Sequence, residues 1–202
     1  VASKVIQCFQ KAEARSKFTD FVVLVDDLKF PCHRFVLSSC SGFFEALLRS
    51  DMREKYERQA TVIGITPAAF QLVLDAMYGN CAALTEDNIL EVWHASNQLQ
   101  IEFLIEICET HILKSINVNN YWDIYVNAEC LDSVKVMGAV KNYMVQNFFQ
   151  VASSGEFRKI YFEDFLEILR SDKLPVCTDF IVESILKWTN ITFEGNTSAK
   201  SI

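Results

Sequence analysis

The chain opens with apolar positions at helical spacing over residues 2–15. Val5, Ile6 and Phe9 share one face of this expected helix, and lysine and glutamine side chains occupy the opposite face. The helix precedes any core that it could join, so its apolar face predicts contact with a partner surface. The alternative is that the helix folds back onto its own domain.

The next pattern predicts a small sheet. Residues 21–25 are apolar and mostly β-branched, which predicts a strand buried on both faces or nearly so. Asp26 and Asp27 indicate a turn, and residues 28–30 predict a returning strand. Pro31 is expected to end that strand.

Two short helices and another strand are expected next. Apolar residues recur at helical spacing over residues 33–49, but Gly42 interrupts them and divides the segment into two helices. Residues 61–63 predict a further strand. Thr66 and Pro67 mark a helix start, because a capping hydroxyl precedes a proline at the first helical position.

The rest of the chain has helical periodicity only. Gly79 is expected to end the helix that begins at Thr66, and Thr85 to cap the next one. Further helices are expected over residues 101–115, 121–128, 137–148, 162–169 and 181–188, with Leu104, Ile107, Cys108 and Ile112 on the inner face of the first. The polar tail from Glu194 predicts disorder. Strands mixed with helices, followed by helices alone, predict an α+β domain and then an all-α region.

Composition excludes several partners. The chain has 202 residues and a net charge of −7, so an acidic surface would repel nucleic acid phosphates and disfavour a polybasic membrane patch. No apolar run approaches the roughly 18 residues of a membrane span. The seven cysteines are odd in number and irregularly spaced, which favours a reducing compartment. We expect a cytoplasmic protein, with the nucleus as a second compartment.

The sequence does not contain the motifs of common enzymes. Phosphate-binding glycine loops, a nucleophile elbow and a His-Glu-x-x-His metal motif do not occur in it. Cys108 and His111 have a spacing that could bind zinc, but no second pair matches it, so packing against neighbouring helices is the favoured interpretation. Cys32 and His33 are adjacent in an extended segment and therefore point to opposite faces. We expect no enzyme activity, no cofactor and no metal.

Two longer motifs carry a resemblance to a known family. They are Phe18-Thr-Asp-Phe-Val-Val-Leu-Val25 and Phe30-Pro-Cys-His-Arg-Phe-Val-Leu-Ser-Ser-Cys-Ser-Gly-Phe-Phe44. Together they resemble the signature of BTB (POZ) domains, and the likeness continues to about residue 115. The resemblance implies a small sheet capped by helices.

The segment after this domain resembles a second module of the same proteins. Residues 117–190 are similar to the helix pair and partial BACK domain that follow BTB in kelch-like proteins, with Asn147-Phe-Phe-Gln-Val151 among the matching residues. We therefore expect a BTB domain over 1–116, an all-α partial BACK domain over 117–193 and a disordered tail over 194–202.

The family resemblance implies two-fold dimers. The residues that we assign to the dimer interface are Val5, Ile6, Phe9, Asp20 and Arg34. Asp20 and Arg34 match positions that form a charged pair near the base of many BTB dimers. The equal alternative is an ordinary structural pair within one chain.

The resemblance also implies binding of cullin-3, the scaffold of a ubiquitin ligase. The residues concerned are Ala46, Leu47, Met52, Glu54 and Tyr125. An apolar Met52 and the carboxylate of Glu54 suit one pocket-filling contact and one charge-assisted hydrogen bond. The alternative is an exposed loop. The family's usual turn after Tyr78 is altered here to Gly79-Asn-Cys-Ala-Ala83, which puts the strength of that binding in doubt.

These resemblances predict a substrate adaptor of a cullin-3 RING E3 ubiquitin ligase. Its expected partners are the cullin-3 N-terminal domain, a second copy of the chain, and a protein substrate held by a domain absent from this sequence. The alternatives are a transcriptional-repressor module, which would usually continue into zinc fingers, and a dimerisation scaffold without cullin binding.

Overall fold

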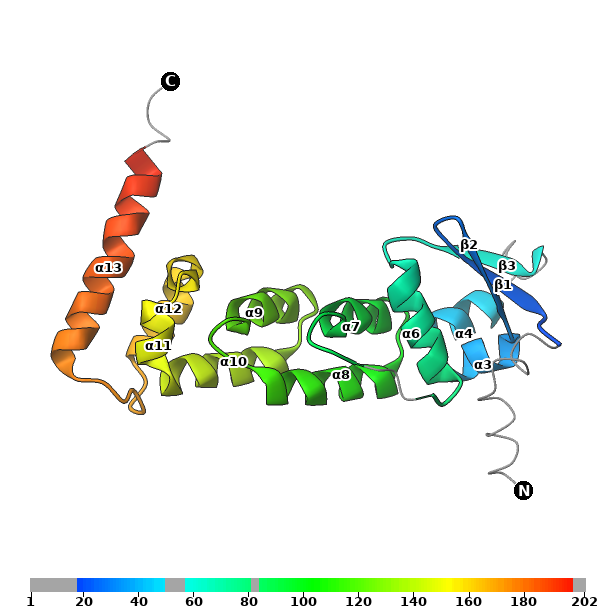
Figure 1. Cartoon of the computed structure of the whole chain (residues 1–202), viewed down its shortest axis with the longest axis horizontal. Coiled ribbons are helices and arrows are strands. Elements are labelled where there is room, and N and C mark those ends of the chain that lie inside the picture. The colour runs from blue at the N-terminus through cyan, green and yellow to red at the C-terminus, as the bar shows by residue number, and fades with distance from the viewer. Residues whose placement is uncertain (1–17, 50–56, 81–83, 198–202) are drawn as a thin grey trace. The chain divides into compact units, whose positions relative to one another are not determined.

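The computed structural model describes residues 18–49, 57–80 and 84–197, and of residues 190–197 only the backbone. The expected helix over residues 2–15 lies outside this range. The chain divides into two compact units, unit 1 over Val1–Ile112 and unit 2 over Leu113–Ile202. Figure 1 shows the sheet and its helices in unit 1 and helices throughout unit 2.

Unit 1 contains a three-stranded sheet with the order β2-β1-β3. β1 (Phe21–Val25) is antiparallel to β2 (Leu28–Cys32) and parallel to β3 (Gln59–Val62). Burial alternates along β1, because Phe21, Val23 and Val25 are at most 2% exposed whereas the two residues between them are half-buried. The strand was expected to be buried on nearly both faces, and the structure instead gives it one core face.

Proline does not end the second strand as the sequence analysis expected. β2 continues through Pro31, which pairs with Val22, and ends at Cys32. Among the described strands β2 lies at an edge of the sheet, where a residue without a backbone N–H removes no bond to a further strand.

The expected break between two helices is confirmed. α3 (Arg34–Cys40) and α4 (Gly42–Arg49) are separated by Ser41 in an extended conformation. The Gly42 N–H donates to the Gln100 carbonyl at 3.0 Å, and a Cβ at Gly42 would lie 2.7 Å from the Gln100 side-chain oxygen. Only glycine permits this close approach without displacing Gln100.

The start and end of α6 (Pro67–Met77) are also as expected. The Thr66 hydroxyl accepts a hydrogen bond from the Ala69 N–H at 3.2 Å, and Gly79 follows the helix with φ +78°. The helix expected after Thr85 begins later, because α7 spans Ile89–Gln98 with Asn88 before it. The Thr85 N–H donates to the Asn88 side chain at 2.9 Å, so these residues form a turn ahead of the helix.

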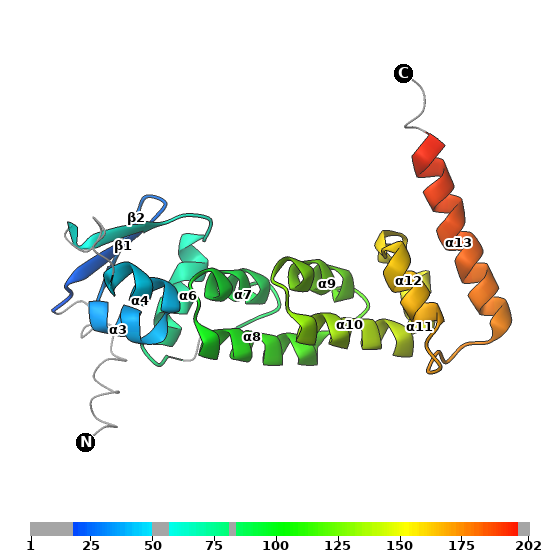
Figure 2. The same cartoon turned by 180° about the vertical axis from the view of Figure 1, so that it is seen from behind.

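α8 spans Glu102–Ser115. Leu104, Cys108 and Ile112 are buried as expected, but Ile107 is 49% exposed, so its assignment to the inner face was wrong. The core of unit 1 includes a close aromatic contact between β2 and α6, where the Phe30 and Phe70 ring centroids are 4.9 Å apart. Figure 2 shows α3, α4 and α6 gathered beside the sheet, as Figure 1 does from the other side.

Unit 2 is helical throughout its described part. Its elements are α9 (Tyr121–Cys130), α10 (Val134–Gln146), α11 (Phe148–Ser153), the short 3-10 helix η1 (Glu156–Lys159), α12 (Phe162–Leu169) and α13 (Thr178–Thr197). α13 runs well past residue 188, where the sequence analysis ended it, and enters the segment expected to be a disordered tail. No helix among the described residues is long and apolar enough to cross a membrane.

Aromatic side chains connect the elements of unit 2. Phe157 of η1 lies 6.1 Å from Phe148 of α11 and 5.5 Å from Phe165 of α12, measured between ring centroids. Phe165 in turn stacks on Trp188 of α13 at 5.1 Å. These rings thus join four successive elements of the unit.

The burial of leucines in unit 1 gives a first test. Leu37 is fully buried in α3 and Leu28 is 54% exposed at the start of β2. We expect Leu37→Ala to lower the free energy of unfolding by about 2–5 kcal/mol because it leaves a cavity. Leu28→Ala is the matched control and should cost under about 1 kcal/mol. Urea unfolding of both variants measures the difference, and equal costs would contradict the described core.

Candidate protein-interaction site

The Asp20 carboxylate holds the start of α3. Its Oδ1 accepts a hydrogen bond from the Arg34 backbone N–H at 2.8 Å, and Arg34 is the first residue of that helix. A carboxylate at this position satisfies a free N–H and complements the helix dipole. The Arg34 guanidinium lies 5.7 Å from the centroid of the Phe21 ring. The structure thus brings Asp20 and Arg34 together within one chain, and their role in a dimer stays a prediction.

Two exposed phenylalanines lie next to this pair in the sequence. Phe18 is 93% exposed and Phe35 is 80% exposed. Sequence reasoning did not single out either residue, because Phe18 was read as part of a family motif and Phe35 as one of several apolar helix positions. Each of these two rings is therefore available for contact with a partner. We call Phe18 and Phe35 the phenylalanine surface. Val5, Ile6 and Phe9 lie outside the described residues.

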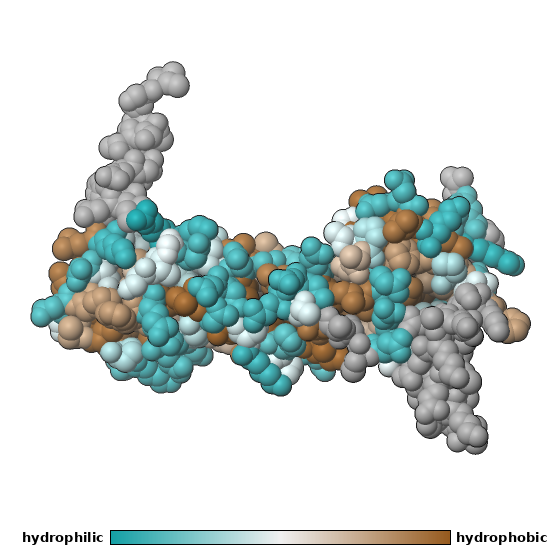
Figure 3. All heavy atoms as spheres, viewed as in Figure 1, coloured by the Kyte–Doolittle hydropathy of each residue, from teal (hydrophilic) through white to brown (hydrophobic). Residues whose placement is uncertain are grey.

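α4 presents the described part of the expected cullin-binding surface. Ala46 is exposed and Leu47 is half-buried, whereas Phe44 one turn earlier is fully buried. The helix ends at Arg49, immediately before residues 50–56. Met52 and Glu54 fall in that segment and therefore lie outside the described residues. Figure 3 shows hydrophilic and hydrophobic residues interspersed over the visible face of the molecule.

Tyr125 is engaged inside unit 2. Its side chain is 4% exposed, and its hydroxyl donates to Asp164 Oδ2 at 2.7 Å. The ammonium of Lys141 on α10 bridges Asp164 Oδ1 at 2.9 Å and Glu167 Oε2 at 2.6 Å. Burial, followed by the bond to Asp164, raises the pKa of Tyr125 above its usual range, so the hydroxyl stays protonated and keeps donating. The hydroxyl thus ties α9 to α12, and contact of Tyr125 with a partner stays a prediction.

Cys32 and His33 bond to different partners, and the thiols of Cys32 and Cys108 are buried. Burial raises the pKa of the Cys32 and Cys108 thiols to about 12, so neither is a thiolate near neutral pH. The Cys32 thiol donates to the Phe30 carbonyl, while His33 Nδ1 lies 2.7 Å from the Tyr78 hydroxyl. Within the described ranges, no group of three or more histidine, cysteine or acidic side chains could hold a metal ion.

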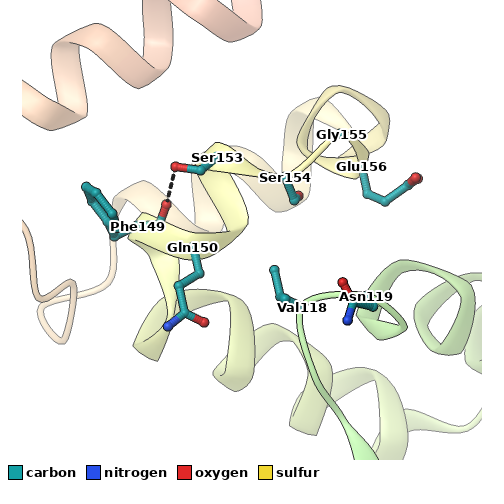
Figure 4. Close-up of a pocket in the computed structure, with 8 residues that line it drawn as sticks. All are labelled: Val118, Asn119, Phe149, Gln150, Ser153, Ser154, Gly155 and Glu156. Carbon is teal, nitrogen blue, oxygen red and sulfur yellow. Dashed lines mark hydrogen bonds between the residues drawn. The ribbon is translucent and has the colours of Figure 1, made fainter.

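Unit 2 contains a pocket of about 540 Å³ between α11, η1 and the segment before α9. Its lining residues are Val118, Asn119, Phe149, Gln150, Ser153, Ser154, Gly155 and Glu156 (Figure 4).

Neither serine of the pocket is placed as a nucleophile. The Ser153 hydroxyl donates to the Phe149 carbonyl at 2.9 Å. The Ser154 hydroxyl lies 2.7 Å from the Val151 carbonyl and 3.0 Å from the Tyr121 hydroxyl. Glu156 forms an ion pair with Lys159 at 2.5 Å, and no histidine is among the lining residues to act as a base toward either serine. This pocket therefore does not have the arrangement of an acyl-transfer site.

Comparison with known families agrees with the fold. The model described as BTB/POZ domain matches residues 9–116, and the model described as BTB And C-terminal Kelch, abbreviated BACK, matches residues 121–200. The chain therefore belongs to the BTB/POZ family, and a BACK region follows its BTB domain.

The curated proteins similar to this chain include kelch-like proteins and Kelch repeat and BTB domain-containing proteins. The chain is 31% identical to human Kelch-like protein 6 over 84% of its own length and 28% of that protein. It is 28% identical to Kelch repeat and BTB domain-containing protein 3 of Pongo abelii, over 95% of the chain and 32% of the relative. The chain is 29% identical to zebrafish Kelch-like protein 24a, over 93% of the chain and 31% of that protein. The chain thus spans about a third of the length of these relatives.

The hydrogen bond between Tyr125 and Asp164 gives a second test. We expect Tyr125→Phe to lower the free energy of unfolding by about 1.5–3 kcal/mol, because it removes a bond to a charged group in a mostly buried position. Asp164→Asn should cost a similar amount, and the double variant should cost less than the sum of the two.

Tyr143→Phe is the matched control. Tyr143 is half-buried, and its hydroxyl has no hydrogen-bond partner among the described residues, so its loss should cost under about 0.5 kcal/mol. Urea unfolding of all four variants measures the coupling. Fully additive costs for Tyr125→Phe and Asp164→Asn would contradict the bond.

Proposed function

We propose that this chain is the dimerising, cullin-binding part of a substrate adaptor for a cullin-3 RING E3 ubiquitin ligase. The observation that carries the proposal is the succession of a BTB domain and a BACK region in one chain with kelch-like relatives. Because the chain spans about a third of those relatives, we assign substrate binding to a domain outside this sequence. The adaptor has no catalytic role and acts in the cytoplasm, with the nucleus as a second compartment.

The α4 surface supports the cullin-binding part of the proposal. Ala46 and Leu47 place apolar side chains at the end of a helix that leads into Met52 and Glu54. An apolar anchor with a nearby carboxylate is a suitable hot spot, since one side chain fills a pocket and the other forms a charge-assisted hydrogen bond. Tyr125 is a weaker candidate for direct contact, because its hydroxyl already binds Asp164.

The phenylalanine surface supports homodimerisation. Phe18 and Phe35 are exposed next to Asp20 and Arg34, where the family resemblance places the dimer base. A two-fold interface uses the same patch on both copies, so an aromatic patch on one chain meets its own equivalent. A dimer would bind two cullin-3 scaffolds and raise the effective concentration of ligase around a bound substrate.

A dimerisation scaffold without cullin binding is the second candidate. The phenylalanine surface favours it, because dimerisation does not require the segment containing Met52 and Glu54. A repressor-type module is less favoured, because the helices of unit 2 and their BACK match follow the BTB domain directly, in place of a polar linker and zinc fingers.

Calorimetric titration with the N-terminal domain of cullin-3 tests the proposal. We expect wild type to bind and Met52→Ala/Glu54→Ala to lose about 2–4 kcal/mol of binding free energy, because an apolar anchor and a charged contact disappear together. Ile63→Ala/Glu102→Ala is the matched control, since it removes the same kinds of side chain from exposed positions of unit 1. Absence of binding by a folded wild-type dimer would refute cullin recruitment and leave the scaffold.

A further inference from the structure

Tyr161 is the most exposed of the five tyrosines whose side chains the structure describes. It is 47% exposed, whereas Tyr78, Tyr121 and Tyr125 are at most 4% exposed and Tyr143 is half-buried. Tyr161 occupies the N-cap position of α12 with an extended backbone. Its ring is therefore available at the surface, and its chain segment is non-helical at that residue.

The Tyr161 ring rests on the aromatic pair of α9. Its centroid lies 5.6 Å from that of Trp122 in an edge-on arrangement, and Trp122 stacks on Tyr125 at 5.7 Å. Trp122 is only 7% exposed. Three residues after Tyr161, Asp164 binds the Tyr125 hydroxyl. The segment 161–164 thus fastens the start of α12 to α9 through one ring contact and one hydrogen bond.

Two acidic side chains lie within electrostatic reach of the Tyr161 hydroxyl. The carboxylate of Glu129 on α9 is the first cause that raises the pKa of Tyr161, and Asp164 contributes in the same direction. Lys141 binds Asp164 and also bridges to Glu167. Lys159 forms an ion pair with Glu156. A further negative charge on this hydroxyl would be repelled by the carboxylates of Glu129 and Asp164.

We propose that Tyr161 is a phosphorylation site and that its phosphorylation detaches the start of α12 from α9. A tyrosine kinase acting in trans would supply ATP. The phenolic oxygen of Tyr161 forms a bond to the γ-phosphorus, the bond to ADP breaks, and the phenolic proton passes to the base of the kinase. The product carries about −2 charge, and its repulsion from Glu129 and Asp164 opposes the ring contact with Trp122.

The helix dipole of α12 does not reverse this effect. A negative charge is favourable at a helix N-terminus, but the first turn of α12 already contains Glu163 and Asp164. The phosphate would also sit at the end of a long side chain whose hydroxyl lies near α9. Repulsion at that end is therefore expected to outweigh the small gain at the helix terminus.

The segment around Tyr161 can open locally for a kinase. η1 has four residues and α12 has eight, and short elements with exposed backbone open at lower cost than a domain core. Opening of this segment would uncover Trp122 and release Asp164 from Tyr125. The inference concerns unit 2 alone and does not depend on cullin-3 binding.

Site-resolved phosphorylation of the whole chain is the first measurement. The chain is incubated with a soluble non-receptor tyrosine kinase domain, ATP and Mg²⁺, and the modified residues are mapped by mass spectrometry. We expect phosphate on Tyr161 at a rate at least about tenfold above that of Tyr121, Tyr125 or Tyr143, because those rings are less exposed. Tyr143→Phe should leave the Tyr161 signal unchanged, and Tyr161→Phe should abolish it.

A free peptide covering residues 156–169 is the control substrate. Phosphorylation of the peptide together with an unmodified Tyr161 in the folded chain would overturn the proposal, because the fold would then block the site. An unmodified Tyr161 in both substrates would overturn it as well, because the local sequence would not be a substrate.

Hydrogen exchange tests the structural consequence. After phosphorylation, the amides of α12 should exchange at least about tenfold faster, whereas those of β1 in unit 1 should keep their rates. Unchanged exchange in α12 after complete modification of Tyr161 would overturn the detachment of the helix. Equal acceleration in β1 would also overturn it, because the effect would then be general destabilisation.

Discussion

The one-sided burial of β1 is the constraint on which unit 1 depends. Strand geometry sends Phe21, Val23 and Val25 into the core, and a shift by one residue would turn all three toward solvent. The same register fixes Asp20 beside the start of α3, where its carboxylate accepts the Arg34 amide. The rings of Phe18 and Phe35, by contrast, are exposed.

Unit 2 combines aromatic packing with a polar network. Tyr125, Asp164 and Lys141 join three helices through one hydroxyl, one carboxylate and one ammonium. Such a network is stable only while every member is satisfied, so each member constrains the position of the others. The pocket serines are likewise bonded to backbone carbonyls. These contacts thus hold the helices of unit 2 in place.

Much of the fold was predictable because it follows local rules. The break at Gly42, the cap at Thr66 and the helical stripes of unit 2 each depend on residues close in sequence. Pro31 was misread because its tolerance depends on β2 being an edge strand, which only the sheet order reveals. The exposure of Ile107 and the bond between Tyr125 and Asp164 depend on which helices meet in space. Family motifs pointed to Asp20 and Arg34, but the exposure of Phe18 and Phe35 appears only in the folded chain.

The central claim is that the phenylalanine surface joins two copies of this chain. Sedimentation equilibrium of the purified chain at micromolar concentration tests it most directly. The account predicts twice the chain mass for wild type, a single chain mass for Phe35→Ser, and an unchanged dimer for Leu28→Ser, which alters an exposed apolar residue elsewhere in unit 1. A monomeric wild type, or a Phe35→Ser variant that remains fully dimeric, would contradict the account.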